Sequence, residues 1–235
     1  ALRAYYEQAG ILIARPAGGT SCRLAISAKG GTNAENHNHN DVGSYAVALG
    51  SETMVGDQGG PNSYPGDYFN GDAPQKYKIK GSFGHPVPVV DGRTQSSGGK
   101  AKGVVLQKEF TNEKDVFSID YTSAYSTPNL DKLIRTFVYD RQGKGSFTVG
   151  DEFTAKIPIR FETAITTRAD WKVLDDTHLL LATDSEQMIV AIDASGKVAF
   201  TSETIEVNSP AYTRIGIALK NQSKEGYIRL KMYTK

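Results

Sequence analysis

Short runs of apolar and β-branched residues recur along most of the chain, and polar or glycine-containing turns separate them. The runs that predict strands are residues 42–49, 53–56, 104–108, 116–123, 133–140, 145–149, 157–167, 179–183, 188–193, 198–200, 204–207, 213–219 and 226–233. Within run 42–49, Tyr45, Val47 and Leu49 fall on one face, as in a half-buried strand. Because crossover helices are missing, the pattern predicts an all-β protein with little helix, built as a large antiparallel β-sandwich.

Three segments depart from this strand pattern. Residues 2–8 suit either the last turn of a helix or a short lead-in. Residues 58–75 are rich in Gly, Pro, Asn and Tyr and predict a long irregular loop, which in a compact domain is often functional. Residues 94–102 are rich in Gly, Ser and Lys and predict a mobile segment. There is no internal repeat, so we expect one domain over residues 1–235.

Composition excludes some function classes. The 27 basic and 26 acidic residues leave a net charge of +1, which gives no general attraction to nucleic acid or membranes. No apolar run approaches the roughly 20 residues of a membrane span. Cys22 is the only cysteine, so no disulfide can form within the chain. The chain opens with Ala rather than Met, which suggests a processed or truncated product.

The segment 36–41, Asn-His-Asn-His-Asn-Asp, carries the clearest chemical signal. If it enters the strand that follows, His37 and His39 project from the same face, because side chains two apart in a strand do so. His85 is followed by Pro86, which favours an extended backbone at His85. Asp57 ends the run 53–56.

Zinc favours His nitrogen and carboxylate oxygen, so His39, Asp57 and His85 form a candidate metal set. Two readings compete with it. Histidines two apart are often only solvated or structural, and Asp41 could replace Asp57 as ligand or hold a ligand imidazole in its tautomer.

These residues resemble a known family. Residues 35–45 are similar to the His-X-His-X-Asp-X-Gly-Ser-aromatic signature of heparinase II/III-like polysaccharide lyases. Asp57-Gln58-Gly59 resembles the family's Asp-X-Gly, and residues 82–92 its segment with a third histidine. The likeness covers about residues 10–95, and the later strands agree with it only in character.

The resemblance implies roles for each site residue. The first His of the pair is catalytic or contacts substrate, which is His37 here. The second His, the Asp and the later His bind a structural zinc, which are His39, Asp57 and His85. The family joins an N-terminal α/α toroid to a C-terminal β-sandwich, and the toroid supplies an active-site tyrosine and asparagine. This chain therefore resembles the sandwich half alone, a fragment whose toroid is missing and which we expect to be inactive by itself.

The implied reaction is β-elimination in a uronate-containing acidic polysaccharide, such as heparan sulfate or alginate. A base removes the proton beside the uronate carboxyl group, an acid serves the leaving oxygen, and the carboxylate must be neutralised. Histidine can neutralise it or take the proton near neutral pH. A zinc that only holds strand ends needs no open coordination position, unlike that of a zinc hydrolase. By the same resemblance we expect a periplasmic or secreted bacterial protein.

Other residues are candidates for holding the polysaccharide. Tyr64 and Tyr68 lie in an aromatic loop suited to pyranose rings, and Arg93 is a nearby cation in the sequence. Lys76, Lys78 and Lys80 alternate as on one face of a strand, where a solvated edge is the plainer reading.

Two further functions stay open. One is a non-catalytic carbohydrate-binding module. The other is a cupin-like metalloenzyme in which His37 and His39 both bind metal. The polymer, endo or exo action, the identity of the metal and the oligomeric state are not fixed by the sequence.

Overall fold

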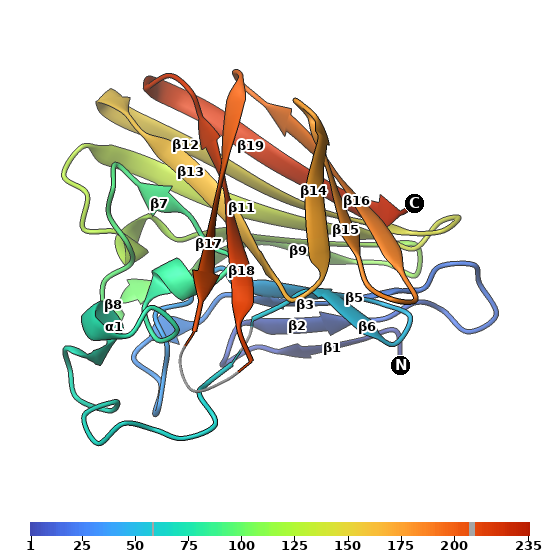
Figure 1. Cartoon of the computed structure of the whole chain (residues 1–235), viewed down its shortest axis with the longest axis horizontal. Coiled ribbons are helices and arrows are strands. Elements are labelled where there is room, and N and C mark those ends of the chain that lie inside the picture. Colours follow the sequence, from blue (N-terminus) through green and yellow to red (C-terminus); the bar gives the residue numbers. More distant parts are fainter. Residues whose placement is uncertain (58, 207–209) are drawn as a thin grey trace.

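The computed structural model describes residues 1–57, 59–206 and 210–235, and nearly all of its regular structure is antiparallel β-sheet (Figure 1). Helix is confined to α1 (Ala73–Lys76) and two 3₁₀ turns, η1 (Ser82–Gly84) and η2 (Thr122–Ala124), in these ranges. The predicted all-β fold with little helix is confirmed. None of the described helices is long and apolar enough to cross a membrane.

The largest sheet has eight strands, and its inner face forms the centre of the hydrophobic core. On β12, Phe147, Val149 and Phe153 alternate with more exposed residues and point to this inner face. In order across the sheet the strands are β14 (Asp170–Asp175), β15 (His178–Ala182), β16 (Gln187–Ala194), β19 (Ser223–Thr234), β12 (Ser146–Ile159), β11 (Leu130–Asp140), β10 (Lys114–Asp120) and β9 (Val104–Phe110).

A five-stranded sheet from the N-terminal part of the chain covers one part of that inner face. The ring of Tyr45 packs against Phe137 and Phe147 of the large sheet, with centroids 6.2 and 5.9 Å away. Figure 1 shows its blue strands in the lower part of the view. In sheet order they are β1 (Arg3–Tyr6), β2 (Ile11–Ala14), β3 (Leu24–Lys29), β5 (Tyr45–Leu49) and β6 (Glu52–Val55).

A four-stranded sheet covers the neighbouring part of the same face. The rings of Phe161 and Phe153 stack with centroids 4.6 Å apart, and the Tyr45 hydroxyl donates to the Ala164 carbonyl. Its strands, in sheet order, are β17 (Val198–Ile205), β18 (Tyr212–Leu219), β13 (Phe161–Thr167) and β7 (Val89–Val90). A separate pair joins β4 (Thr32–Asn33) to β8 (Gly98–Lys102).

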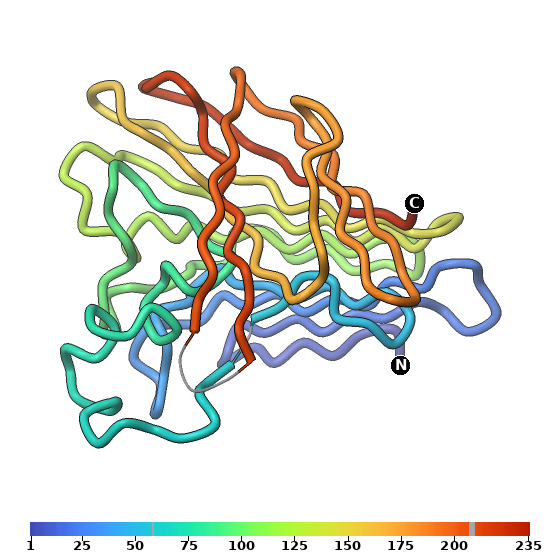
Figure 2. Tube along the Cα trace, viewed as in Figure 1, coloured from blue at the N-terminus to red at the C-terminus, as the bar shows by residue number. Residues whose placement is uncertain are grey.

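Long loops leave these sheets at one end of the molecule, where Figure 2 traces the segments after β6 in cyan and teal. A second, small apolar cluster of Tyr68, Ile79, Ile205 and Tyr212 packs this region against the β17–β18 hairpin. The Tyr212 hydroxyl also donates to the Gly84 carbonyl over 2.9 Å. The predicted loop 58–75 is therefore anchored to the sandwich, with residue 58 outside the described ranges.

Several local predictions were wrong. Residues 2–8 contain the edge strand β1 rather than a helix, because they pair with the apolar strand β2. Segment 94–102 is not wholly a mobile stretch, since residues 98–102 form β8. The predicted lysine strand 76–80 is instead the end of α1 and a turn.

Other strand boundaries also differ. The predicted break between 149 and 157 does not exist, since β12 runs unbroken across it. The runs 198–200 and 204–207 belong to the single strand β17 as far as residue 205, and residue 207 lies outside the described ranges. The strands that the prediction missed include β2, β3, β4, β7 and β14.

Candidate functional site

His37 and His39 lie in a turn between β4 and β5, not in a strand. The amide of Asn38 donates to the Glu35 carbonyl over 3.1 Å, and His37 adopts a left-handed backbone with φ of 58°. Such a φ is uncommon for a non-glycine residue and ends the alternation of a strand. The expectation that both rings face one space was therefore wrong: His37 is exposed, and the His39 ring turns inward.

His39, His85 and Asp57 come together from three separate loops. Nδ1 of His39 lies 3.2 Å from Nε2 of His85, and Nδ1 of His85 lies 3.1 Å from Oδ2 of Asp57. His85 is buried, at 1% exposure, and its backbone is extended as Pro86 predicted. Asp57 also accepts hydrogen bonds from the Ser44 hydroxyl and the Gly59 amide.

Tyr68 extends this chain of contacts, since its hydroxyl lies 3.1 Å from Nε2 of His39. With Asp57 ionised and both rings neutral, each bond has one consistent direction. His85 donates from Nδ1 to Asp57, His39 donates from Nδ1 to His85, and Tyr68 donates to His39. Without a metal, all four groups are thus satisfied by one another.

Burial and charge shift the pKa values of this cluster. Burial, reinforced by the charge of His85, lowers the pKa of His39 to about 4. Burial alone would lower the pKa of His85 and raise that of Asp57, but their mutual attraction and hydrogen bond reverse both shifts. Burial raises the pKa of Tyr68 to about 12. His39 is therefore a neutral imidazole at pH 7, the form that binds metal.

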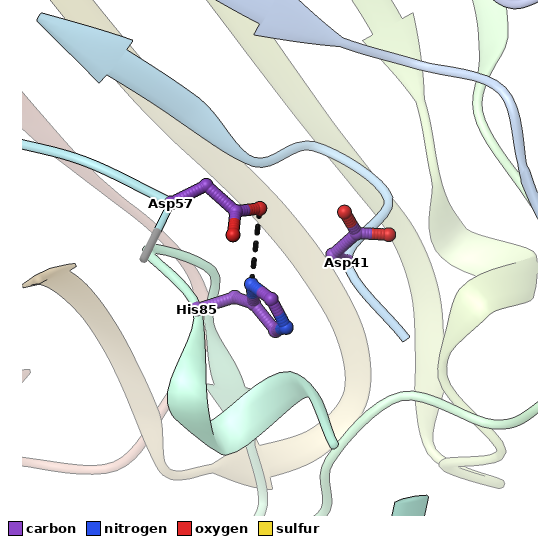
Figure 3. A group of neighbouring side chains, drawn as sticks. All are labelled: Asp41, Asp57 and His85. Atoms are coloured by element: carbon purple, nitrogen blue, oxygen red, sulfur yellow. Dashed lines mark hydrogen bonds and ion pairs between the residues drawn. The ribbon is translucent and has the colours of Figure 1, made fainter. Parts of the chain in front are cut away.

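Asp41 lies beside this cluster, as Figure 3 shows, and one ligand atom from each of Asp41, Asp57 and His85 lies within 4.8 Å of the other two. The ammonium of Lys29 forms an ion pair with the Asp41 carboxylate. Burial raises the pKa of Asp41, and Lys29 opposes that rise. A cation held by Asp41 would have to displace Lys29 or lie close to it, whereas Asp57 is paired with His85.

The donor types suit zinc, although His39 and Asp57 contact opposite nitrogens of the His85 ring, Nε2 and Nδ1. The set offers two imidazole nitrogens and a carboxylate in a largely enclosed place, and Zn–N bonds of about 2.0–2.1 Å in a tetrahedron set nitrogens roughly 3.3–3.4 Å apart. The 3.2 Å between Nδ1 of His39 and Nε2 of His85 is close to that separation. Binding of one zinc by all three residues would therefore require the His85 ring or the Asp57 side chain to shift from these contacts.

His37 lines a cleft of about 450 Å³. Its ring contacts Phe69, with centroids 4.7 Å apart. The cleft is rich in amide side chains, and its lining consists of Asn33, Glu35, Asn36, His37, Asn38, Asn40, Phe69, Asn70, Gly71, Pro74, Lys80 and Ser97. A larger hollow of about 680 Å³ lies over β12 and β19 and contains none of the predicted site residues.

The three predicted substrate-binding residues have different surroundings. Tyr64 is exposed and packs against Phe69, which lines the cleft. Tyr68 is 1% exposed, so its ring offers no free face to a sugar and its hydroxyl serves His39 instead. Arg93 is exposed in the turn after β7 and is not part of the cleft lining.

A buried ion pair beneath the site was missed by sequence reasoning. Arg135 and Asp151 face each other on β11 and β12, with two N–O contacts of 2.7 Å and almost no exposure. Nη1 of Arg135 also donates to the carbonyls of Gly43 and Pro86, over 2.6 and 2.8 Å. Gly43 lies two residues after Asp41, and Pro86 directly follows His85. Arg135 therefore fixes two loops of the site to the large sheet.

No protein-family model and no curated protein matches the chain. Solved structures do. Heparan sulfate lyase HepC from Pedobacter heparinus matches over 100% of this chain and 37% of its own, with 14% identity and a TM-score of 0.76. A mutant of that lyase gives 16% identity and a TM-score of 0.75 over the same shares. A structure of heparinase III matches over 99% of this chain and 36% of its own, with 17% identity and a TM-score of 0.75.

At these identities the likeness shows the fold. The predicted resemblance to the heparinase sandwich is confirmed at that level, since the whole chain superposes on part of these lyases. The chain spans about 37% of the length of HepC.

Proposed function

We propose that this chain is the β-sandwich part of a polysaccharide lyase that cleaves uronate-containing acidic polysaccharides by β-elimination. The observation that carries the proposal is that the two histidines of one turn have different surroundings. His37 lies exposed at a cleft, while His39, two residues later, joins His85 and Asp57 inside. The fold around that turn is one that heparan sulfate lyases also have.

His37 is the group that meets the substrate. In β-elimination the proton beside the uronate carboxyl group leaves, the bond from the ring to the 4-linked oxygen breaks, and a ring double bond forms. The departing oxygen takes up a proton. An imidazole at the cleft can neutralise the carboxylate or exchange a proton near neutral pH.

His39, Asp57 and His85 would hold a structural zinc. Bound there, zinc would supply a fixed positive charge that ties three loops together. The chain's own residues position His37, because the inward contacts of His39 hold the turn that places His37 at the cleft. The three ligands come from loops around β5, β6 and η1, so a metal would rigidify the cleft rather than activate water.

We expect the activity to need more than this chain. It spans about 37% of HepC, so we propose that residues 1–235 form one sandwich domain of a longer enzyme. The remaining active-site groups, a tyrosine and an asparagine by family resemblance, would come from an N-terminal toroid. A polysaccharide substrate also implies a periplasmic or secreted location.

The test is to express the whole product of the gene and screen acidic polysaccharides for the ultraviolet absorbance of an unsaturated uronate. Heparan sulfate, unsulfated heparosan and alginate cover the main classes. We expect one class to give a rising absorbance. No signal on any of them with zinc-loaded, folded protein would sink the lyase proposal.

A carbohydrate-binding module without catalysis is the second candidate, because Tyr64 and Phe69 are exposed aromatic rings beside the cleft. It predicts oligosaccharide binding without unsaturated product in the same screen. The cupin-like alternative is disfavoured, because the turn points His37 away from the ring that contacts His85.

A further inference from the structure

Lys80 is a buried lysine in the turn that follows α1. The residue is 5% exposed and lines the same cleft as His37. Its carbonyl accepts a hydrogen bond from the Asn40 amide over 3.0 Å, next to His39. The backbone that carries Lys80 is therefore fixed to the histidine turn at the cleft.

No carboxylate neutralises this ammonium. Lys80 forms no ion pair in the described ranges, and the residues outside them (58 and 207–209) include no Asp or Glu. Its Nζ donates to the Tyr68 carbonyl over 2.5 Å and lies over the rings of Tyr68 and Phe69, 4.8 and 5.0 Å from their centroids. Burial lowers its pKa. The two neighbouring lysines, by contrast, are exposed and paired, Lys76 with Asp67 and Lys78 with Glu203.

An ammonium has three donor protons, and the contacts above use one of them with an oxygen acceptor. Burying a cation without a counter-charge costs free energy, which an anion bound in the cleft would recover. The cleft is also lined by the amide side chains of Asn36 and Asn70. Glu35 is the one acidic residue in its described lining, and it is exposed and accepts a hydrogen bond from Thr32.

We propose that Lys80 recognises the anionic group of an acidic sugar in the His37 cleft, and so sets the preference for charged over neutral glycans. This rests on the proposed function, because that function supplies the sugar. Lys80 is a recognition residue here, and the rings of Tyr68 and Phe69 lie beside its ammonium.

The test measures binding of three hexasaccharides to the chain by calorimetry. The first is heparosan, which carries uronate carboxylates and no sulfate. The second is carboxyl-reduced heparosan, which is neutral. The third is a sulfated hexasaccharide with its carboxyl groups reduced. Lys80→Met removes the charge and keeps the apolar stem, and Lys78→Met is the matched control that removes the same net charge nearby.

We expect the wild type to prefer an anionic hexasaccharide over the neutral one, and Lys80→Met to weaken that binding by about tenfold or more, as for loss of a hydrogen bond to a charged group. Binding of the neutral sugar should stay unchanged, and Lys78→Met should change any affinity by less than about threefold. A loss confined to heparosan identifies a carboxylate as the ligand group, and a loss confined to the sulfated sugar identifies a sulfate.

Three results would overturn the inference: equal losses for neutral and anionic sugars, a preference that survives in Lys80→Met, or no binding by the wild type. The lyase screen tests the proposed function separately. Unsaturated product could form even if Lys80→Met kept the wild-type preference for anionic sugars, and only the inference about Lys80 would then fail. If Lys80→Met does not fold, Lys80→Gln, which can still donate to the Tyr68 carbonyl, takes its place. Lys80→Arg, which keeps the charge, should retain the preference.

Discussion

One residue separates His37 from His39, yet the left-handed backbone at His37 sends their rings into different surroundings. His37 contacts Phe69 at the cleft, and His39 lies between Tyr68 and His85. A strained φ at a non-glycine residue persists where the surroundings hold it, and such positions cluster at functional sites. Here the inward contacts of His39 hold the backbone of His37 in this conformation.

The separation of roles gives a paired prediction on metal content. His39→Ala should weaken zinc binding more than about 100-fold, because loss even of a group that only supports a ligand costs 10–100-fold. His37→Ala should bind zinc as the wild type does. Elemental analysis after dialysis against a competing chelator measures both. Equal metal loss in the two variants would contradict the assignment.

Tyr68 provides a finer probe of the same site. Tyr68→Phe keeps the buried ring but removes the hydroxyl that lies 3.1 Å from Nε2 of His39. We expect zinc affinity to fall about 10–100-fold, the usual effect of losing a group that orients a ligand histidine. Tyr77→Phe is the control, since its hydroxyl in the same loop region bonds Asp67 instead. Unchanged affinity in Tyr68→Phe would show that this hydroxyl does not orient the ring.

At the scale of elements, the site depends on loops that the strands β11 and β12 hold from below. Arg135 bridges Asp151 to the carbonyls of Gly43 and Pro86, and Tyr121 and Thr163 complete the carboxylate's hydrogen bonds. A buried charge that loses its partner is left unpaired in a low-dielectric place.

Arg135→Met should therefore destabilise the chain by about 3–5 kcal/mol, as for other broken buried pairs. Urea unfolding followed by circular dichroism measures it. The control is Arg229→Met on β19, whose partners Glu152 and Asp193 are exposed, and its cost should stay below about 1 kcal/mol. A cost for Arg135→Met no larger than for the control would remove the ion pair from the explanation of how the loops are held.

The strands were predictable because alternation of apolar and polar residues survives in an antiparallel sheet with one buried face. Arg135 and Asp151 also carry a signal that was overlooked: each falls in phase with inward apolar neighbours on its own strand, Phe137 and Phe153 for example. Two opposite charges at inward positions of adjacent strands indicate a buried pair.

The loops were less predictable. The lysine at 80 looked like an exposed edge residue, because alternation alone does not show that a turn folds it beneath Tyr68 and Phe69. His85, Asp57 and His39 were proposed from the ligands that zinc prefers and then supported by the family resemblance, and the structure brings their side chains together. Their roles stay predictions.

At the scale of the whole molecule, two smaller sheets cover one face of the eight-stranded sheet, and the site lies where their loops emerge. The core is continuous across all three sheets and does not include His39, Asp57 or His85. Removing a metal should therefore loosen the loops and leave the sandwich folded.

Chelation should lower the melting temperature by about 5–10 °C, from the roughly 2.7 kcal/mol that a ligand at 100 times its Kd contributes and the 2–4 °C per kcal/mol of a chain this size. Far-ultraviolet circular dichroism at 25 °C should not change. Calorimetry with and without chelator, repeated on His39→Ala as a control that has no metal to lose, measures the shift. Complete unfolding on chelation would show that the metal supports the core itself.

The most direct test of the central claim compares His37→Ala with the wild type in the whole gene product, using the polysaccharide that the screen identifies. Release of unsaturated uronate is followed by ultraviolet absorbance, and zinc content and melting temperature are measured on the same samples. We expect the rate to fall by about 10²–10⁴-fold, the usual contribution of a group that transfers a proton, with zinc and melting temperature unchanged. A His37→Ala enzyme that keeps the wild-type rate would contradict the claim that this histidine meets the substrate.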